Sequence, residues 1–334
     1  MLTKLYLPVY FPPPSLPCPA ISVIIPLYNT EKYIGECLES ILNQTFQSFE
    51  VIVVDDCSTD NSVKVVESYI PKFNGRLRLY HTEKNSGSGG YVPRNIGLNF
   101  AGGKYVYFVD ADDFILLTAL EILYNAAEEY DADVVYMTSH YWMDGPQKII
   151  VKPDQISGQF LAEGTEEETT LIVDASNKLV RDILLKNHHR TPWTKLILRK
   201  LLTENNILFH EITVGEDNLW TLSVYAHSKR FLRLPLSLYF LRRYTSDTLT
   251  KSNRPDNKYD PLSVLGFIKW FKALKELTRR IEFLKENPDL SCQMAKGYFD
   301  WFGRRLDESE KTLYVRDVCD ILRREFFDDF TANF

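Results

Sequence analysis

Carboxylates gather at the end of one apolar stretch of the chain. Residues 105–113 read YVYFVDADD, so a run of mostly apolar, strand-forming residues leads directly into Asp110, Asp112 and Asp113. Like charges at short range raise one another's pKa, and such a cluster therefore needs a positive partner. Hard cations such as Mg²⁺ and Mn²⁺ take oxygen ligands, commonly one or two carboxylates together with substrate phosphates. The cluster therefore predicts a divalent cation that carries a diphosphate.

Two other apolar runs end in a similar way. ISVIIPLYN occupies residues 21–29, and EVIVVDDCSTDNS occupies residues 50–62. Ligands of parallel α/β sheets bind beyond the carboxyl ends of the strands. We therefore expect several aspartates and the aromatic ring of Tyr28 to converge on one edge of a sheet.

Some of these aspartates have a structural explanation. An aspartate at the start of a helix accepts hydrogen bonds from free backbone N–H groups. We expect Asp113 to cap the helix that follows it, and Asp60 to form a turn or cap before a helix at 61–70. Asp55 is expected to shape the end of its strand.

Two further segments carry residues suited to the same site. NSGSGGYVPRNIG at 85–97 has glycines that allow a ligand to approach the backbone, and Arg94 could bind an anionic group. It lacks the GxxxxGK[ST] pattern of a Walker loop. Glu216 and Asp217 stand in the apolar stretch ITVGEDNLWTLSVYA. A partly desolvated carboxylate has a raised pKa, which suits a proton acceptor.

The elements that position these residues alternate along the first part of the chain. Apolar, β-branched runs predict strands at 21–25, 50–54, 76–81, 104–109 and 133–138. Helical spacing predicts helices at 31–44, 61–70, 92–101 and 117–130, the first capped by Asn29 or Thr30 and the second stopped by Pro71. This alternation indicates an α/β fold with a mostly parallel sheet covered by helices on both faces.

The rest of the chain divides into less regular and helical regions. Residues 1–19 are predicted to form an extended arm stiffened by prolines. Residues 20–250 are predicted to form the main domain, with an insertion or loop at 143–180. Residues 255–334 are predicted to form a helical region. From 254 onward basic and acidic residues are equal in number, which argues against a polybasic membrane tether. We expect the C-terminal helices to pack on the main domain or to form a homodimer. Their aromatic residues leave peripheral membrane contact as an alternative.

Composition limits the class of protein. The 334 residues carry a net charge of −6, which gives no reason to expect a nucleic acid as partner. The five scattered cysteines include no CxxC pair, so neither a disulfide framework nor a zinc site is indicated. No signal peptide or apolar run of about 18 residues is evident. We expect a cytoplasmic protein, with the cytoplasmic face of a membrane as the alternative.

The ordered set of motifs resembles the family 2 glycosyltransferases of the GT-A fold. The residues that carry the resemblance are the segments at 21–62, PRNIGLNFAGGKYVYFVDADD at 93–113 and VGEDNLW at 214–220. The matching motifs follow one another closely over about residues 20–138, and further matches occur at about residues 190–250. The resemblance implies a Rossmann-like GT-A domain, a Mn²⁺ or Mg²⁺ cofactor, and an inverting transfer from a nucleotide-sugar.

The resemblance also implies roles on the donor side. Pro26 and Tyr28 match the loop that packs on the nucleotide base, and Asp56 matches the acid that accepts a hydrogen bond from uracil. Asp110 and Asp112 match the DxD pair, with Asp110 on the ribose or metal side and Asp112 binding the metal that bridges the diphosphate. The implied donor is a UDP-sugar.

On the acceptor side, Asp217 matches the general base, with Glu216 beside it. Trp193 and Lys195 match a recurring W-x-K element, in which Trp193 is expected to pack on the acceptor side. The implied acceptor is a glycan or a lipid-linked glycan, such as a growing polysaccharide, capsule or lipopolysaccharide.

Several basic residues are further candidates for binding the diphosphate or the metal ion. Arg242 or Arg243 is a candidate for contact with the diphosphate when a loop closes. His188 and His189 could complete the metal site or bind phosphate, although paired histidines at this spacing are more often structural.

Two other functions compete with glycosyl transfer. A sugar nucleotidyltransferase would be expected to have a glycine-rich, basic first loop, but PLYNTEKY contains neither GxG nor arginine. A catalytically inactive relative that binds sugar-nucleotides is the other alternative. The intact acids at 56, 110, 112 and 217 argue against it.

Overall fold

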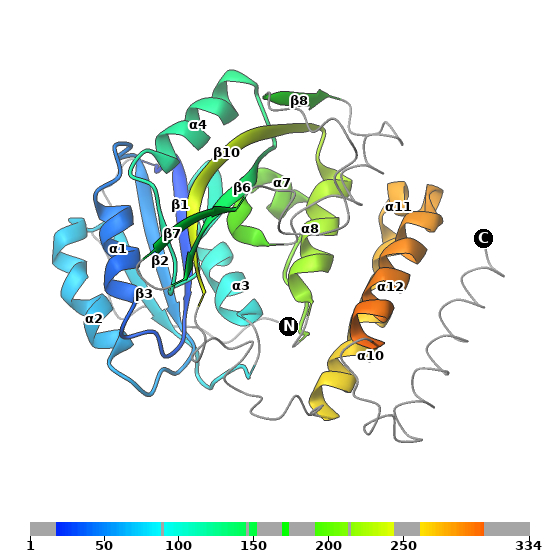
Figure 1. The fold of residues 1–334 in the computed structure, drawn as a ribbon, viewed down its shortest axis with the longest axis horizontal. Coiled ribbons are helices and arrows are strands. Elements are labelled where there is room, and N and C mark those ends of the chain that lie inside the picture. The colour runs from blue at the N-terminus through cyan, green and yellow to red at the C-terminus, as the bar shows by residue number, and fades with distance from the viewer. Residues whose placement is uncertain are drawn as a thin grey trace.

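The computed structural model describes residues 18–87, 90–144, 147–151, 169–173, 191–212, 215–243 and 261–303. Within these residues a single twisted sheet is flanked by helices, and a further group of helices lies beside α8 (Figure 1). Several predictions fall outside the described residues: nearly all of the N-terminal arm, His188 and His189, most of 143–180, the domain boundary near 250 and everything beyond 303.

Four parallel strands form the first half of the sheet, as the alternating pattern predicts. Their order is β3 (Leu77–His81), β2 (Phe49–Asp55), β1 (Ile21–Leu27) and β4 (Tyr105–Phe108). The helices that connect and follow them are α1 (Ile34–Leu42), α2 (Ser62–Tyr69), α3 (Tyr91–Phe100) and α4 (Ala119–Glu129). The 3-10 turn Ile70–Phe73 contains Pro71, so α2 ends where that proline predicts.

The second half of the sheet is mixed. Strand β9 (Lys195–Leu198) lies antiparallel between β4 and β6 (Val134–Asp144), and β10 (Arg230–Arg243) runs parallel to β6. The short strands β5 (Phe114–Ile115), β7 (Gln147–Val151) and β8 (Thr170–Val173) pair antiparallel at its edges. Residues 133–138 therefore do not pair with the preceding strand. The sequence pattern missed β9 because its partners are remote along the chain.

Both faces of β1, β2 and β4 are buried, which explains why these strands are largely apolar. Along β1, Val23 and Ile25 belong to the core beneath α1 and α4, whereas Ile24 faces α3. Helix α3 lies very close to the strand, since a Cβ atom at Gly97 would come within 2.4 Å of Ile24.

Helix α8 (Glu216–His227) has apolar partners on two sides. One side packs with the sheet and α7 (Arg199–Glu204), and the other packs with α10 (Pro261–Arg280), α11 (Glu282–Glu286) and α12 (Pro288–Gly303). The predicted packing of C-terminal helices on the main domain is thus seen for α10, α11 and α12. Dimer formation stays a prediction. None of the helices in the described part of the chain is long and apolar enough to span a bilayer.

Candidate active site

The loops after β1, β2 and β4 meet at one edge of the sheet. The amide of Asp56 donates to the Leu27 carbonyl at 2.8 Å, and the amide of Val109 donates to the Ile24 carbonyl at 3.0 Å. These bonds extend the strand pairing to the point where each loop begins. The aspartates that follow β2 and β4 are therefore brought to the same edge, as expected from parallel pairing.

The first helix lacks the side-chain cap that the sequence predicts. Tyr33 occupies the N-cap position of α1, and neither Asn29 nor Thr30 caps it through a side chain. Instead the Asn29 Oδ1 atom accepts a hydrogen bond from the Thr59 amide at 2.8 Å. Asn29 thus joins the loop after β1 to the loop after β2, a contact between segments 30 residues apart.

Asp55 and Asp60 have the structural roles predicted for them. Asp60 accepts hydrogen bonds from the amides of Ser62 at 2.9 Å and Glu31 at 3.0 Å. Asp55 accepts one from the Ser58 amide at 3.2 Å. Both carboxylates shape the loop at the end of β2, which leaves Asp56 as the remaining acid of this group.

Asp56 is buried between β2 and the loop that follows β3. Its carboxylate accepts hydrogen bonds from Thr82 Oγ1 at 2.9 Å and from the Ser86 amide and hydroxyl at 3.0 and 2.6 Å. Pro26 and Tyr28 lie half-buried at the end of β1 and directly after it. Contact of these three residues with a nucleotide base stays a prediction.

Arg94 joins the two acidic motifs. Its guanidinium, on α3, is buried, and Nη2 donates to Asp110 Oδ1 at 2.9 Å. The Nη1 atom lies 3.6 Å from Asp217 Oδ1 and 3.9 Å from Glu216 Oε1. Gly90, at φ +99°, makes room for this group, because a Cβ atom there would lie 3.0 Å from Nη1.

The chain therefore supplies part of the positive charge that the carboxylate cluster requires. Burial alone would lower the pKa of Arg94, but the charges of Asp217, Asp110 and Glu216 together raise it above its ordinary value. The sequence predicts an anionic partner for Arg94 but does not signal that the partners are the protein's own acids.

Asp112 has no ion-pair partner among the described residues. Burial and the neighbouring charge of Asp110 raise the pKa of Asp112 to about 6, and among the described residues no side chain forms an ion pair with it. In the same part of the chain, no cluster of three or more histidine, cysteine, aspartate or glutamate side chains could hold a metal ion. Asp110 and Asp112 fit a cation whose other ligands are phosphate oxygens and water.

Asp113 is not a helix cap, contrary to the prediction. It is buried, and α4 begins six residues later, after Thr118. Its carboxylate accepts hydrogen bonds from the Tyr239 hydroxyl at 2.8 Å and from the Arg242 amide at 2.7 Å. Tyr239 also accepts a hydrogen bond from the Asp110 amide at 3.1 Å. Strand β10 therefore holds residues 110–113, which we call the DADD loop, in place.

Replacing Asp113 by Ala is expected to destabilise the protein by about 1–3 kcal/mol. The Tyr239 hydroxyl and the Arg242 amide would lose their acceptor, and a buried donor without a partner costs about 1–3 kcal/mol. Urea unfolding followed by fluorescence measures the change. Glu129→Ala, on the exposed side of α4, is the control and is expected to leave the unfolding midpoint unchanged. Equal midpoints for the two variants would contradict the anchoring role.

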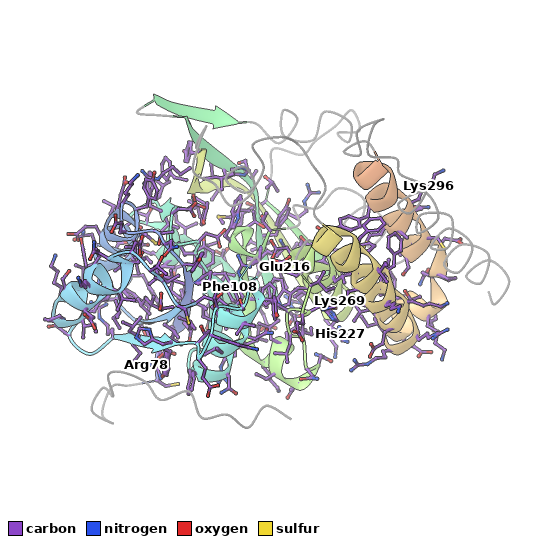
Figure 2. The ribbon with its side chains drawn as sticks, turned by 90° about the horizontal axis from the view of Figure 1, so that it is seen from below. Arg78, Phe108, Glu216, His227, Lys269 and Lys296 are labelled. Atoms are coloured by element: carbon purple, nitrogen blue, oxygen red, sulfur yellow. The ribbon has the colours of Figure 1, made fainter. Side chains whose placement is uncertain are left out.

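Helix α8 presents Glu216 and Asp217 in its first turn. Gly215, at φ +84°, precedes them at the N-cap position. Figure 2 shows Glu216 toward the middle of the molecule, between the sheet that carries Phe108 and the helix α10 that carries Lys269. The Glu216 side chain is 8% exposed and that of Asp217 is 29% exposed, so Asp217 is the more accessible acid.

Both acids have raised pKa values. Burial, followed by the charge of Asp217, raises the pKa of Glu216 to about 8. Burial also raises the pKa of Asp217 to about 6, with Arg94 and Lys195 opposing the rise and Asp110 adding to it. The Asp217 Oδ1 atom accepts no hydrogen bond from any described residue. Asp217 is therefore a partly exposed carboxylate with the raised basicity that a proton acceptor needs.

Lys195 lies fully buried near this pair. Its Nζ atom donates to the Thr191 carbonyl at 2.7 Å and lies 5.5 and 5.6 Å from the ring centres of Tyr136 and Tyr225. Burial lowers the pKa of Lys195 to about 7, and the charge of Asp217 opposes this shift. The lysine of the W-x-K element is thus electrostatically coupled to the predicted base.

Trp193 lies in the core of the described structure. It is 4% exposed and stacks on Tyr239 with ring centres 4.4 Å apart. Its ring therefore supports the tyrosine that holds the DADD loop. Packing of Trp193 on the acceptor side stays a prediction.

At the end of β10, the structure describes the side chain of Arg242 but not that of Arg243. The Arg242 Nε atom donates to the Asp112 carbonyl at 2.9 Å, and the guanidinium also pairs with Glu36. These bonds hold the DADD loop and the start of α1 together. The side chain of Arg243 lies outside the described residues, so its contact with a diphosphate stays a prediction.

Comparison with known sequences agrees with this geometry. The Glycosyl transferase family 2 model matches residues 22–202, more than half of the chain. The poly(ribitol-phosphate) beta-N-acetylglucosaminyltransferase TarS of Staphylococcus aureus is 35% identical over 222 residues, covering 66% of this chain and 35% of TarS. The glycosyltransferase GlyG of Streptococcus pneumoniae is 44% identical over 115 residues, covering 34% of this chain and 37% of GlyG. The chain therefore spans about a third of the length of these relatives.

Comparison with solved structures identifies the same fold. The crystal structure of S. aureus TarS 1–349 in complex with UDP-GlcNAc is similar, with a TM-score of 0.59 and 29% identity, covering 77% of this chain and 66% of that one. The complex of TarS 1–349 with UDP has a TM-score of 0.54. The predicted α/β GT-A fold is confirmed.

Proposed function

Because the chain belongs to the family 2 glycosyltransferases, we propose that it transfers a sugar from a UDP-sugar to a hydroxyl group of a growing glycan or polyol-phosphate polymer. The names of its relatives support this choice, since TarS is a poly(ribitol-phosphate) N-acetylglucosaminyltransferase and its structure was solved with UDP-GlcNAc. N-Acetylglucosamine and glucose are the first sugars to test, since a similar Bacillus protein is a poly(ribitol-phosphate) beta-glucosyltransferase.

One observation carries the proposal: the buried guanidinium of Arg94 contacts Asp110 on one side and Asp217 on the other. Asp110 belongs to the motif proposed for the donor diphosphate. Asp217 is the proposed proton acceptor for the incoming hydroxyl. Transfer requires these two functions within one sugar ring of each other, and a single side chain that touches both acids meets that requirement.

Asp217 would take the proton of the acceptor hydroxyl as its oxygen attacks the anomeric carbon of the donor sugar. A new carbon–oxygen bond forms on one face while the bond to the nucleoside diphosphate breaks on the other, which inverts the anomeric centre. Arg94 lowers the pKa of Asp217 relative to burial alone and so keeps this carboxylate ionised near neutral pH. Lys195 acts in the same direction.

Asp110 and Asp112 would hold a Mn²⁺ or Mg²⁺ ion together with the diphosphate. When bound, such an ion stabilises the negative charge that develops on the departing nucleoside diphosphate. Asp112 supplies a carboxylate without an ion-pair partner among the described residues, and burial, followed by the charge of Asp110, raises its pKa to about 6. The DADD loop is held rigidly by β10, so both carboxylates stay at the end of β4.

A panel of radiolabelled nucleotide-sugars tests the proposal. The protein is incubated with each donor, a poly(ribitol-phosphate) or glycan acceptor, and either Mn²⁺ or a chelator. Metal-dependent release of UDP with label on the acceptor supports the proposal. Consumption of a nucleoside triphosphate with release of pyrophosphate would indicate a nucleotidyltransferase instead. Binding of UDP-sugar without release from any donor would indicate an inactive relative.

The transfer rate is expected to fall at acidic pH because Asp217 must be ionised to accept a proton. With its pKa near 6, kcat should decrease about tenfold per pH unit below that value. The titratable groups that interact with Asp217 are Arg94, Asp110 and Lys195, together with the neighbouring Glu216. Rates are measured at saturating donor, acceptor and Mn²⁺, so that protonation of Asp112 and weaker metal binding do not contribute.

The Lys195→Met variant tests the direction in which this pH profile of kcat should move. The positive charge of Lys195 lowers the pKa of Asp217, so removing it should move the acidic limb of kcat to higher pH. A kcat that stays constant between pH 5 and 7 in the wild-type protein would contradict the role of Asp217. A limb that moves to lower pH in the variant would contradict the role of Lys195.

A further inference from the structure

The C-terminal helices touch the backbone that leads into the two acids of α8. The indole Nε1 of Trp270, on α10, donates a hydrogen bond to the Gly215 carbonyl at 3.0 Å. The amide of Asn218 donates to the same carbonyl at 3.1 Å, closing the first turn of α8. One oxygen atom therefore connects a side chain of the C-terminal region to the turn that contains Glu216 and Asp217.

A second aromatic residue closes the other side of this backbone. Tyr298, on α12, stacks on Trp270 with ring centres 4.1 Å apart and an angle of 24°. A Cβ atom at Gly215 would lie 2.4 Å from the Tyr298 hydroxyl oxygen and 3.1 Å from Trp270 Cδ1. Position 215 thus requires glycine for two reasons. Its φ is +84°, and the two rings occupy the space that a side chain would need. The peptide before Glu216 is enclosed by aromatic side chains.

The packing beneath these rings is a continuous apolar layer between α8 and the C-terminal helices. Trp270 is fully buried and Tyr298 is 3% exposed. Their neighbours in the layer are Leu219, Leu222 and Ala226 of α8 and Phe267, Phe271, Leu274 and Leu277 of α10. The first turn of α8 consequently lies between two fixed supports, the Arg94 guanidinium on the sheet side and the Trp270–Tyr298 pair on the C-terminal side.

We propose that Trp270 and Tyr298 are positioning residues that hold Asp217 in its reactive place, so that the C-terminal helices form part of the catalytic unit. The proposal rests on the transfer reaction proposed above. Gly215 has no side chain to restrict its backbone, and the rotation of this peptide would move the carboxylate two residues later. A displacement of about 1 Å between reacting groups can reduce a rate by about 100-fold.

Trp270→Phe tests the hydrogen bond while keeping an aromatic ring at the position. We expect kcat at saturating substrates to fall by about tenfold or more. The Kd of UDP with Mn²⁺ should stay within about twofold, because among the described residues no hydrogen bond or ion pair joins α10 to Asp110 or Asp112. Hydrogen exchange read by mass spectrometry should be faster at residues 216–219 in the variant, since the Gly215 carbonyl loses one of its two donors.

Leu277→Ala is the matched control for loss of packing. Leu277 lies on the same face of α10, seven residues and about 10 Å further along the helix, and belongs to the same apolar layer. This variant should unfold at a lower temperature than the wild-type protein and keep its kcat. If the layer only stabilises the fold, kcat corrected for the folded fraction should equal the wild-type value in both variants, and that result would overturn the proposal. An equal loss of corrected kcat in both variants would also overturn it, because the effect would then not be specific to Trp270.

The two proposals fail in different ways. Wild-type kcat and wild-type exchange at residues 216–219 in Trp270→Phe would overturn the positioning role and leave the transfer reaction intact. If the wild-type protein transfers sugar from no donor, the proposed function is wrong. Exchange at the start of α8 then still decides whether Trp270 holds this turn, because it is measured without substrate.

Discussion

Replacing Asp217 by Asn is expected to lower the rate of sugar transfer by about 10²- to 10⁴-fold, the usual contribution of a general base. Asparagine has nearly the same shape as aspartate but cannot accept the proton of the incoming hydroxyl. The donor side is unchanged, because Asp110 and Asp112 remain in place. Calorimetry should therefore give a Kd for UDP with Mn²⁺ close to the wild-type value, while the turnover assay shows little transfer.

Glu216→Gln is the matched control for this variant. Glu216 is the neighbouring acid in the same turn, but its side chain is 8% exposed against 29% for Asp217. Its pKa, raised to about 8 by burial and by the charge of Asp217, leaves it mostly protonated at neutral pH and makes it the poorer proton acceptor. A smaller loss of transfer is expected. If Glu216→Gln abolished transfer and Asp217→Asn did not, the assignment of the base would have to be reversed.

Asp112→Asn is expected to weaken metal-dependent binding of UDP by about 100-fold or more. Changes to residues that merely orient metal ligands cost about 10–100-fold, so removing a ligand charge should cost at least as much. Titration of UDP into the protein with Mn²⁺ measures the effect. The variant in Mn²⁺ should behave like the wild-type protein in a chelator.

A second comparison tests whether the roles of the two acids are separate. Asp112→Asn should lose binding and transfer together, whereas Asp217→Asn should lose transfer alone. Equal loss of binding in both variants would contradict the division of labour between the end of β4 and the start of α8. Unfolding midpoints of both variants, measured in the same buffer, show whether any loss reflects unfolding.

Much of the parallel half of the fold is predictable from local patterns. The strands at 21–25, 50–54 and 104–109 are short, β-branched and apolar, since both of their faces are buried. Their ends are marked by the switch from apolar residues to aspartate. The expectation that these ends converge then follows from parallel pairing alone.

The mixed half of the sheet could not be predicted in this way. Strand β9 lies between β4 and β6, about 60 to 90 residues away along the chain. The segment from 195 to 198 is apolar, but its pairing is decided by which neighbours remain available after the first strands have formed. Tyr239 reaches Asp113 across 126 residues, and this contact overturned the capping role expected for Asp113.

The sequence alone determined which acids stand at the ends of strands and that Glu216 and Asp217 lie in an apolar stretch, because strand patterning and apolar patterning are local properties. Only the tertiary structure decided what each acid meets. Arg94 lies between Asp110 and Asp217, and Trp270 holds the peptide before Glu216, although these partners are 16, 123 and 55 residues apart. The pKa of a carboxylate depends on burial and on charges a few ångströms away. The chemistry of the site was therefore set by contacts that no local pattern specifies.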